Sequence, residues 1–187
     1  MPETNQNSRN FPTIDLGDFI LREQNVEDAP AFFEYFADPE VSQYIISSIP
    51  TTIAEARTEI RYWINVFDYN DGIYFAIARK SDNKMIGSVG VSGINRIHNR
   101  IEASYDLAKE YWGQGLMSKA LKAVTDYAFK TRKFNRIEAI AMPDNVGSYK
   151  VLEKCGFIFE GVLRQHRFHK GKYVDVRIYS LLYSDSV

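Results

Sequence analysis

The feature that most constrains the fold of this chain is a repeated change in the spacing of its apolar residues. Between residues 26 and 67, apolar side chains recur every three or four positions, which is typical of amphipathic helices. Residues 73–107 instead contain short apolar runs separated by polar turns, as expected for antiparallel strands. After residue 115 the helical spacing returns and then alternates with further strands. This order predicts a single α+β domain built on a mixed sheet.

Turn residues and helix caps divide the chain into elements. Thr51 or Thr52 can cap the second helix, with Glu55 placed as the capping-box partner of Thr52. Pro39 and Gly156 are expected to end the helices that precede them. We expect helices over 26–37, 53–67, 116–128 and 148–154, and strands over 19–22, 73–79, 85–91, 101–107, 137–142, 157–168 and 173–182.

Length and composition fit one soluble domain. The chain has 187 residues, 45% of them hydrophobic, so we expect a flexible polar arm over 1–12 and a single domain over 13–187. A net charge of −1 argues against direct binding of nucleic acid. The single cysteine, Cys155, excludes an internal disulfide or a zinc cluster and is expected to pack in the core. No stretch is long enough to cross a membrane and no secretory signal is seen, so we expect a cytoplasmic protein.

One glycine-containing turn points to a ligand. Gly113-Gln114-Gly115 follows a predicted strand and is followed at once by a long predicted helix. The free N–H groups at the start of a helix, together with its dipole, favour an anion such as a phosphate. A tight strand-to-helix connection is the simpler alternative. The sequence lacks the G-x-x-x-x-G-K-[ST] pattern and a G-x-G-x-x-G after a first strand, which argues against a P-loop or dinucleotide fold.

The same turn resembles the [RQ]-x-x-G-x-[GA] loop of the GCN5-related N-acetyltransferase (GNAT) superfamily. Glu110 departs from the usual Arg or Gln at the first position. Further segments, in the same order along residues 16–183, are similar to the RimJ/RimL branch of ribosomal-protein N-acetyltransferases. They are Phe19-Ile20-Leu21-Arg22, Asp38-Pro39-Glu40-Val41, Ile101-Glu102-Ala103-Ser104-Tyr105-Asp106-Leu107, Asn145-Val146-Gly147-Ser148, Val151-Leu152-Glu153-Lys154-Cys155-Gly156-Phe157, Glu160-Gly161-Val162-Leu163-Arg164 and Gly171-Lys172-Tyr173-Val174-Asp175.

The resemblance implies a fold and a co-substrate. The fold is a mostly antiparallel twisted sheet of about seven strands, flanked by helices, with a V-shaped splay between strands 101–107 and 137–142. The co-substrate is acetyl-CoA, and no metal is implied. The pantetheine arm would lie in the splay against strand backbone at Leu107, held by Asn145, which is equally suited to cap a helix. The pyrophosphate would meet the N–H groups of Gly113, Gln114, Gly115 and Leu116, and Lys109, Lys119 or Lys150 could reach the 3′-phosphate.

Two residues are candidates for catalysis, Ser148 from the resemblance and Glu102 from strand alternation. Ser148 would protonate the leaving coenzyme A thiolate. The alternative interpretation is that Ser148 is only an exposed serine on a helix. Strand alternation places Glu102, Ser104 and Asp106 on one face. Glu102 is the preferred general base, and its alternative is a salt bridge to Arg100 or Arg136.

Other side chains were weighed for these two roles. Asp106 is a weaker candidate base, and so are His166 and His169 of the last hairpin, for which plain exposure is the default. Tyr149 is the other hydroxyl near Ser148 and is expected to pack in the core.

We therefore expect an N-acetyltransferase that transfers an acetyl group to a primary amine by direct attack. The acceptor would be a protein N-terminal α-amine or a small amine. The alternative is a non-catalytic sensor of coenzyme A or acyl-CoA. A homodimer is also expected, because open sheet edges favour pairing.

Overall fold

The computed structural model describes residues 10–46 and 49–185, and its strands form one sheet. The described part of the chain has eight strands in the order β1-β2-β3-β4-β5-β6-β8-β7. Every neighbouring pair is antiparallel except β5 and β6. The extra strand relative to the expected seven is β1, whose two residues are too few to show a period. The strands are β1 (Ile14–Asp15), β2 (Phe19–Glu23), β3 (Gly72–Arg79), β4 (Met85–Asn95), β5 (Arg100–Leu107), β6 (Arg136–Ala141), β7 (Ile158–His169) and β8 (Lys172–Leu182).

The predicted helices are confirmed, with small shifts at their ends. Thr52 caps α3 by accepting from the Glu55 N–H, but the Glu55 carboxylate accepts from Thr51 rather than Thr52. A short helix that periodicity did not indicate follows Asp38, whose side chain caps it. The helices are α1 (Ala29–Phe36), α2 (Pro39–Ser42), α3 (Ile53–Asp68), α4 (Leu116–Arg132) and α5 (Val146–Lys154), with 3-10 turns at Val26–Asp28, Lys109–Tyr111 and Tyr183–Asp185.

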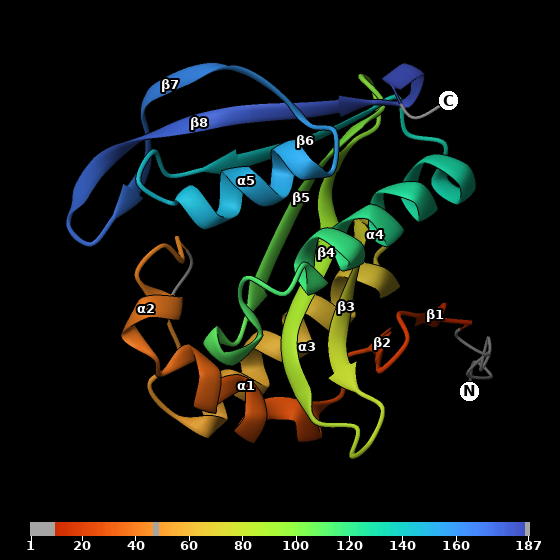
Figure 1. The fold of residues 1–187 in the computed structure, drawn as a ribbon, viewed down its shortest axis with the longest axis vertical. Coiled ribbons are helices and arrows are strands. Elements are labelled where there is room, and N and C mark those ends of the chain that lie inside the picture. The colour runs from red at the N-terminus through yellow and green to blue at the C-terminus, as the bar shows by residue number, and fades with distance from the viewer. Residues whose placement is uncertain (1–9, 47–48, 186–187) are drawn as a thin grey trace, which may run out of the picture.

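The sheet separates two apolar cores. In β3, Ile73, Phe75 and Ile77 join the core under α4 and α5, whereas Ala76 joins the one under α1 and α3. This alternation follows from the two-residue period of a strand. Figure 1 shows α4 and α5 on the near face of the sheet, and α3 behind it. None of the described helices is long and apolar enough to cross a membrane.

Part of the expected N-terminal arm is packed. Residues 1–9 lie outside the described residues. The ring of Phe11, however, lies 4.9 Å from the Phe67 ring and 5.0 Å from the Phe75 ring. Aromatic pairs at this separation add to the stability gained by burial. The described end of the arm is therefore anchored on α3 and β3.

The splay is formed by β5 and β6. These two parallel strands pair only where residues 100–102 face 136–138. Figure 1 shows β5 (green) and β6 (teal) starting side by side at the upper right and then separating. Each strand remains bonded on its other side, β5 to β4 and β6 to β8. The sheet therefore opens between two well-supported halves.

An ion-pair network closes the narrow end of the splay. Arg100 and Arg136 both bind the Glu138 carboxylate, at 2.6 and 2.9 Å. Arg136 also binds Glu160 of β7 at 2.5 Å, and Ser180 donates to Glu160 at 2.6 Å. The alternative to a base role for Glu102 was a salt bridge to Arg100 or Arg136. This alternative is wrong, because both arginines bind Glu138 of β6 and Glu102 lies beside Arg167 instead.

Acid should weaken this network. Hydrogen bonds from Arg136 and then Ser180 lower the pKa of the Glu160 carboxyl from 4.5 to about 2. Burial alone would raise the pKa of Glu138, but Arg100 and Arg136 lower it. A carboxyl whose pKa is depressed by folding stabilises the fold above its unfolded pKa, and this stabilisation is lost as the pH falls through the folded pKa. We expect the free energy of unfolding in urea to fall between about pH 4.5 and about pH 2. If the free energy of unfolding of Glu160→Gln fell equally steeply with pH, the loss of stability could not be assigned to the Glu160 carboxyl.

Candidate active site

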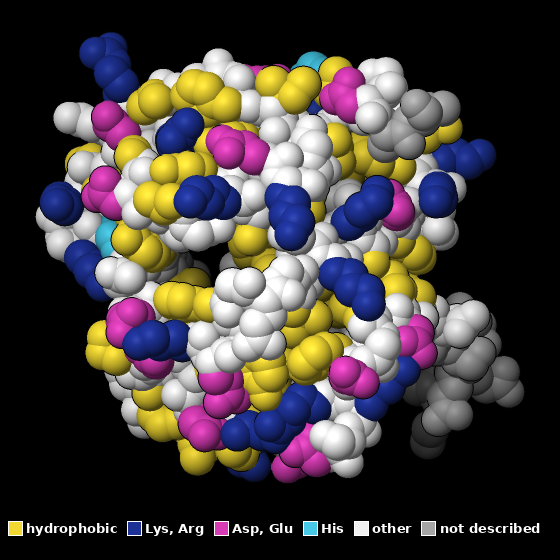
Figure 2. All heavy atoms as spheres, in the orientation of Figure 1, with side chains coloured by type: hydrophobic (Ala, Val, Ile, Leu, Met, Phe, Trp, Pro, Cys, Tyr) yellow, Lys and Arg dark blue, Asp and Glu magenta, His cyan; other side chains and the backbone are white. Residues whose placement is uncertain are grey.

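The opening of the sheet forms a cleft of about 900 Å³. Figure 2 shows its mouth as a hollow between the α5 half of the molecule and the half that carries α1 and α2. Side chains of α1, α2 and α3 line one wall, and α5 with residues 112–118 lines the other. Of the predicted site residues, Glu102, Asp106, Leu107, Gly113, Gly115, Leu116, Asn145 and Ser148 line the cleft, and so does Lys150, whereas Gln114 does not.

The predicted glycine turn connects β5 to α4 through two residues with positive φ. Gly113 and Gly115 have φ values of +72° and +77°, a left-handed conformation that L side chains rarely adopt. Gly115 is the N-cap of α4 and forms no side-chain cap bond. The first turn of α4 lines the cleft, so its N–H groups and the helix dipole can bind an anion there.

Trp112 holds this turn against β5, and Gln114 holds it against the preceding 3-10 turn. The Trp112 indole N–H donates to the Leu107 carbonyl at 2.8 Å, and the Gln114 amide donates to the Glu110 carbonyl at 2.7 Å. Gln114 therefore stabilises the turn from outside the cleft, and only its N–H remains a candidate contact. The Leu107 carbonyl is engaged by Trp112, so the pairing of Leu107 with a pantetheine arm stays a prediction.

The lysines near the turn are sorted by their partners. Lys109 is paired with Glu40, and Lys119 donates to the Leu16 carbonyl at 2.7 Å. Lys150 and Lys154 instead line the cleft. The Lys154 Nζ lies 3.7 Å from where a Cβ on Gly115 would stand. Lys154 was missed, although its spacing of four residues from Lys150 places both on one helix face.

Ser148 lies at the start of α5 beside a tyrosine that the sequence analysis missed. The Tyr105 hydroxyl lies 3.0 Å from the Ser148 Oγ and donates to the Ser148 carbonyl at 2.9 Å. Burial raises the pKa of the Tyr105 phenol, so it stays protonated. The Asn145 side chain accepts from the Ser148 N–H at 3.1 Å and thus caps α5. The amide of Asn145 also lines the cleft, so it can serve both roles.

Glu102 and Asp106 lie on the same face of β5 in different surroundings. The Glu102 side chain is 43% exposed and lies 3.5 Å from the Arg167 guanidinium. Asp106 accepts from the Tyr35 hydroxyl at 2.7 Å, the Ser88 hydroxyl at 2.5 Å and the Ser88 N–H at 3.1 Å. Burial raises the pKa of the Asp106 carboxyl to about 6. The expected alternation along the strand is confirmed.

Neither hairpin histidine is among the described residues that line the cleft. His166 is exposed, whereas His169 is buried and its Nε2 lies 2.9 Å from the Gln43 carbonyl. The expectation that His169 is exposed is therefore wrong, because the β7–β8 hairpin packs against the segment after α2. The Cys155 thiol donates to the Ser118 carbonyl, and burial raises its pKa to about 11. The raised pKa disfavours the thiolate, which agrees with the packing role expected for Cys155.

Comparisons with known proteins agree with this geometry. The acetyltransferase (GNAT) domain family matches residues 18–158. A Bacillus licheniformis protein named "Uncharacterized N-acetyltransferase p20" is 35% identical over 162 residues, which cover 87% of this chain and 91% of that protein. The crystal structure of a ribosomal-protein-S5-alanine acetyltransferase from Vibrio fischeri has a TM-score of 0.81 at 25% identity and covers 93% of this chain and 98% of its own.

A further structure shares the fold at lower identity. It is RimL, a ribosomal L7/L12 α-N-protein acetyltransferase in complex with coenzyme A, with a TM-score of 0.82 at 22% identity. The match covers 91% of this chain and 98% of that one. With the family match and the named relatives, these findings favour an enzyme over a non-catalytic sensor. The protein belongs to the GNAT family of acetyltransferases and is an N-acetyltransferase.

Proposed function

We propose that the enzyme transfers the acetyl group of acetyl-CoA to a primary amine by direct attack within the cleft. The observation that carries this proposal is the cleft itself. Where β5 and β6 separate, it brings Glu102, Ser148 and the glycine turn to one cavity. RimL and RimJ, which share the fold, have been solved with coenzyme A, which supports the same co-substrate here.

The residues of the chain divide the reaction into three tasks. The turn at Gly113–Gly115 and the nearby Lys154 bind the anionic phosphates. Glu102 takes the proton from the acceptor ammonium, directly or through water, so that the amine can attack the thioester carbon. The amine forms the new C–N bond at the thioester carbon, and the C–S bond breaks as the tetrahedral intermediate collapses. The Ser148 hydroxyl gives its proton to the leaving thiolate and regains a proton, directly or through water, from the nitrogen that becomes the amide. Tyr105, hydrogen-bonded to Ser148, supports that hydroxyl.

Glu102 fits the role of base better than Asp106. The Asp106 carboxylate already accepts three hydrogen bonds, from Tyr35 and Ser88. These bonds stabilise the ionised form and tie β5 to α1 and β4. Among the described residues, Glu102 forms an ion pair with Arg167 only, and it faces the cleft. Asp106 is accordingly assigned to the structure of the acceptor wall.

Glu102→Gln should lower kcat by roughly tenfold to a hundredfold, because the amide cannot take a proton. The dissociation constant for acetyl-CoA should stay unchanged, since Glu102 lies on the acceptor side. Thiol release measures the first quantity and calorimetry the second. Asp106→Asn is the matched comparison. If it lost more activity than Glu102→Gln while the fold remained intact, the two roles would be exchanged.

The acceptor is proposed as a protein N-terminal α-amine or a small amine. The structure neighbour from Vibrio fischeri is named for a ribosomal-protein alanine. That name supports an α-amine acceptor for this chain. A panel of amino-terminal peptides and small amines, each followed by thiol release, separates the two classes.

Binding of the co-substrate is the direct test of the proposal. Acetyl-CoA at about a hundred times its dissociation constant should raise the free energy of unfolding by roughly 2.7 kcal/mol. Heat of binding and thermal shift are measured together, with 3′-dephospho-CoA as the comparison. Lys154→Met should weaken binding of both forms, since Lys154 lies beside the turn that takes the pyrophosphate. If neither acetyl-CoA nor 3′-dephospho-CoA bound, the proposal would be wrong.

A further inference from the structure

Charged side chains of both signs line the cleft. Lys150 and Lys154 line the wall assigned to the coenzyme. The acceptor wall carries Glu59 and Asp106, and within residues 10–46 and 49–185 no Lys or Arg forms an ion pair with either. Burial raises the pKa of both carboxyls. Each has therefore lost water without gaining a cation, so a positive charge that entered the cleft would be attracted there.

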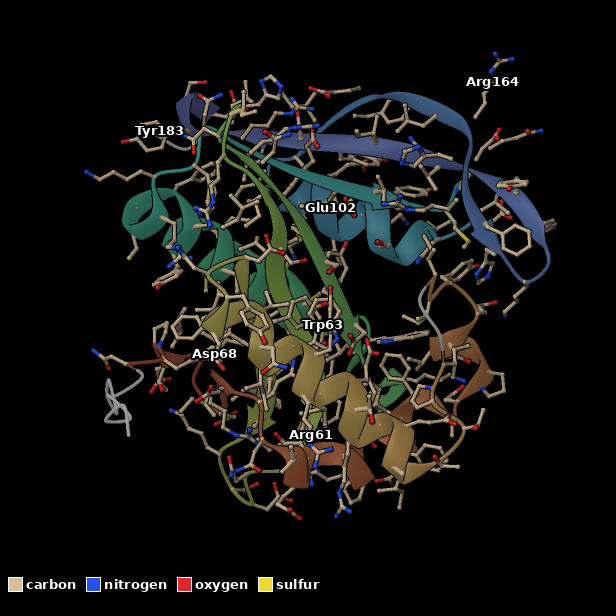
Figure 3. All side chains as sticks on the ribbon, turned by 180° about the vertical axis from the view of Figure 1, so that it is seen from behind. Arg61, Trp63, Asp68, Glu102, Arg164 and Tyr183 are labelled. Atoms are coloured by element: carbon tan, nitrogen blue, oxygen red, sulfur yellow. The ribbon has the colours of Figure 1, made fainter. Side chains whose placement is uncertain are left out.

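Aromatic rings hold Glu59 at this wall. The Trp63 indole N–H donates to the Glu59 carboxylate at 3.0 Å from one turn further along α3. The Trp63 ring stacks on the Tyr74 ring, with centroids 4.0 Å apart and planes 22° apart. The Tyr74 hydroxyl in turn lies 3.1 Å from the Ser104 hydroxyl, between Glu102 and Asp106 on β5. Figure 3 shows Trp63 on α3 below Glu102 on β5.

This arrangement suits a cationic group of the acceptor other than the reacting ammonium, rather than an apolar group. Trp63 and Tyr74 both line the cleft, and aromatic faces attract ammonium and guanidinium groups. Glu59 adds a formal negative charge beside them. Glu102 already faces Arg167 and is assigned to the reacting amine. Glu59 is thus left with no task in the acetyl transfer itself.

We propose that the acceptor carries a second positively charged nitrogen, and that Glu59 and Trp63 bind it while Glu102 serves the amine that is acetylated. This inference rests on the proposed function. Two sources share this chemistry: a small diamine or polyamine, and a peptide whose N-terminal residue is followed by a basic side chain. Only the reacting nitrogen loses its proton, and the second stays charged throughout.

Matched acceptor pairs test the proposal. We would compare 1-butylamine with 1,4-diaminobutane, and an Ala-Ala peptide with an Ala-Arg peptide, by acetyl-CoA-dependent thiol release. The dicationic member of at least one pair should have a kcat/KM about tenfold higher, as a partly buried cation site implies. The pair that shows the difference identifies the source. Equal values within both pairs would overturn the inference and leave the acetyltransferase proposal standing.

A variant of similar shape but without the charge tests whether Glu59 causes the preference for the dication. Glu59→Gln keeps an oxygen for the Trp63 N–H but removes the charge, so the tenfold preference should disappear while the rate with 1-butylamine stays the same. Glu34→Gln on α1 is the control, because it removes one charge outside the cleft. It should keep the preference. A preference that survived in Glu59→Gln would remove Glu59 from the site.

A binding measurement separates this inference from the proposed function. Calorimetry of 1,4-diaminobutane and of 1-butylamine against the protein, with and without coenzyme A, needs no turnover. The parent should bind the diamine about tenfold more tightly than the monoamine, and Glu59→Gln should bind the two with equal affinity. If acetyl-CoA failed to bind, the proposed function would fall, and the diamine result would still decide whether the cation site exists.

Discussion

Ser148→Ala should lower the rate of acetyl transfer by about a hundredfold without weakening acetyl-CoA binding. The variant removes the hydroxyl assigned to protonate the leaving thiolate, and loss of a positioned acid or base typically costs that much. Ser148 forms its cap bond through its backbone N–H, so α5 keeps its N-terminus in the variant. Single-turnover acetylation measures the rate, and calorimetry measures binding of acetyl-CoA.

Two tyrosines serve as comparisons for Ser148. Tyr105→Phe should lower the rate by less, because it removes only the hydrogen bond 3.0 Å from the Ser148 hydroxyl. Tyr149→Phe should leave the rate unchanged, since Tyr149 packs under the Arg177 guanidinium, 4.4 Å from its ring centre, and is not among the described lining residues. A parental rate in Ser148→Ala would show that another group protonates the thiolate.

Gly90→Ala should lower the free energy of unfolding by about 3 kcal/mol, which corresponds to a Tm lower by roughly 10 °C. A Cβ on Gly90 would stand 2.3 Å from the Tyr74 ring, 2.4 Å from the Ile73 carbonyl and 2.6 Å from the Tyr74 Cα. Two of these atoms belong to backbone in the centre of the sheet, so they cannot rotate away. Urea unfolding and a thermal scan measure the loss.

Gly147→Ala is the control for this prediction. Its new Cβ would meet only the Asn145 side chain, at 3.8 Å, and alanine favours a helix over glycine by about 1 kcal/mol. We expect an unchanged or slightly higher Tm for Gly147→Ala.

Gly90→Ala should also displace Tyr74 from Trp63, which a change in tryptophan fluorescence would report. A parental Tm for Gly90→Ala would contradict the close approach of β4 and β3.

Much of the fold could be predicted because its signals are local. The helical and strand periods located α1, α3, α4 and α5 and all strands except β1. The elements that periodicity did not reveal, β1 and α2, span two and four residues, fewer than one full period needs to be recognised. Asp38 and Pro39 begin α2 through a side-chain cap and a proline at its first position, and both signals were visible.

The candidate site was predicted unevenly, for a reason that depends on distance along the chain. Ser148, Asn145, Glu102 and the glycine turn stand in motifs, so resemblance alone placed them in one cleft. The ion pairs were predicted less well. Arg167, which lies beside Glu102, comes from a hairpin 65 residues away, and neither spacing nor motif relates the two. The alternative that paired Glu102 with Arg100 or Arg136 named the wrong glutamate, because strand register is a tertiary property.

The sequence by itself determined the longer helices and strands and the glycine turn before α4, because each depends on neighbours a few positions apart. The order of its motifs indicated the GNAT family. Only the tertiary structure decided where β5 and β6 separate and which side chains meet in the opening. Tyr105 reaches Ser148 across 43 residues and Tyr35 reaches Asp106 across 71. Such contacts arise from the packing of the two halves of the sheet, and no local pattern encodes them.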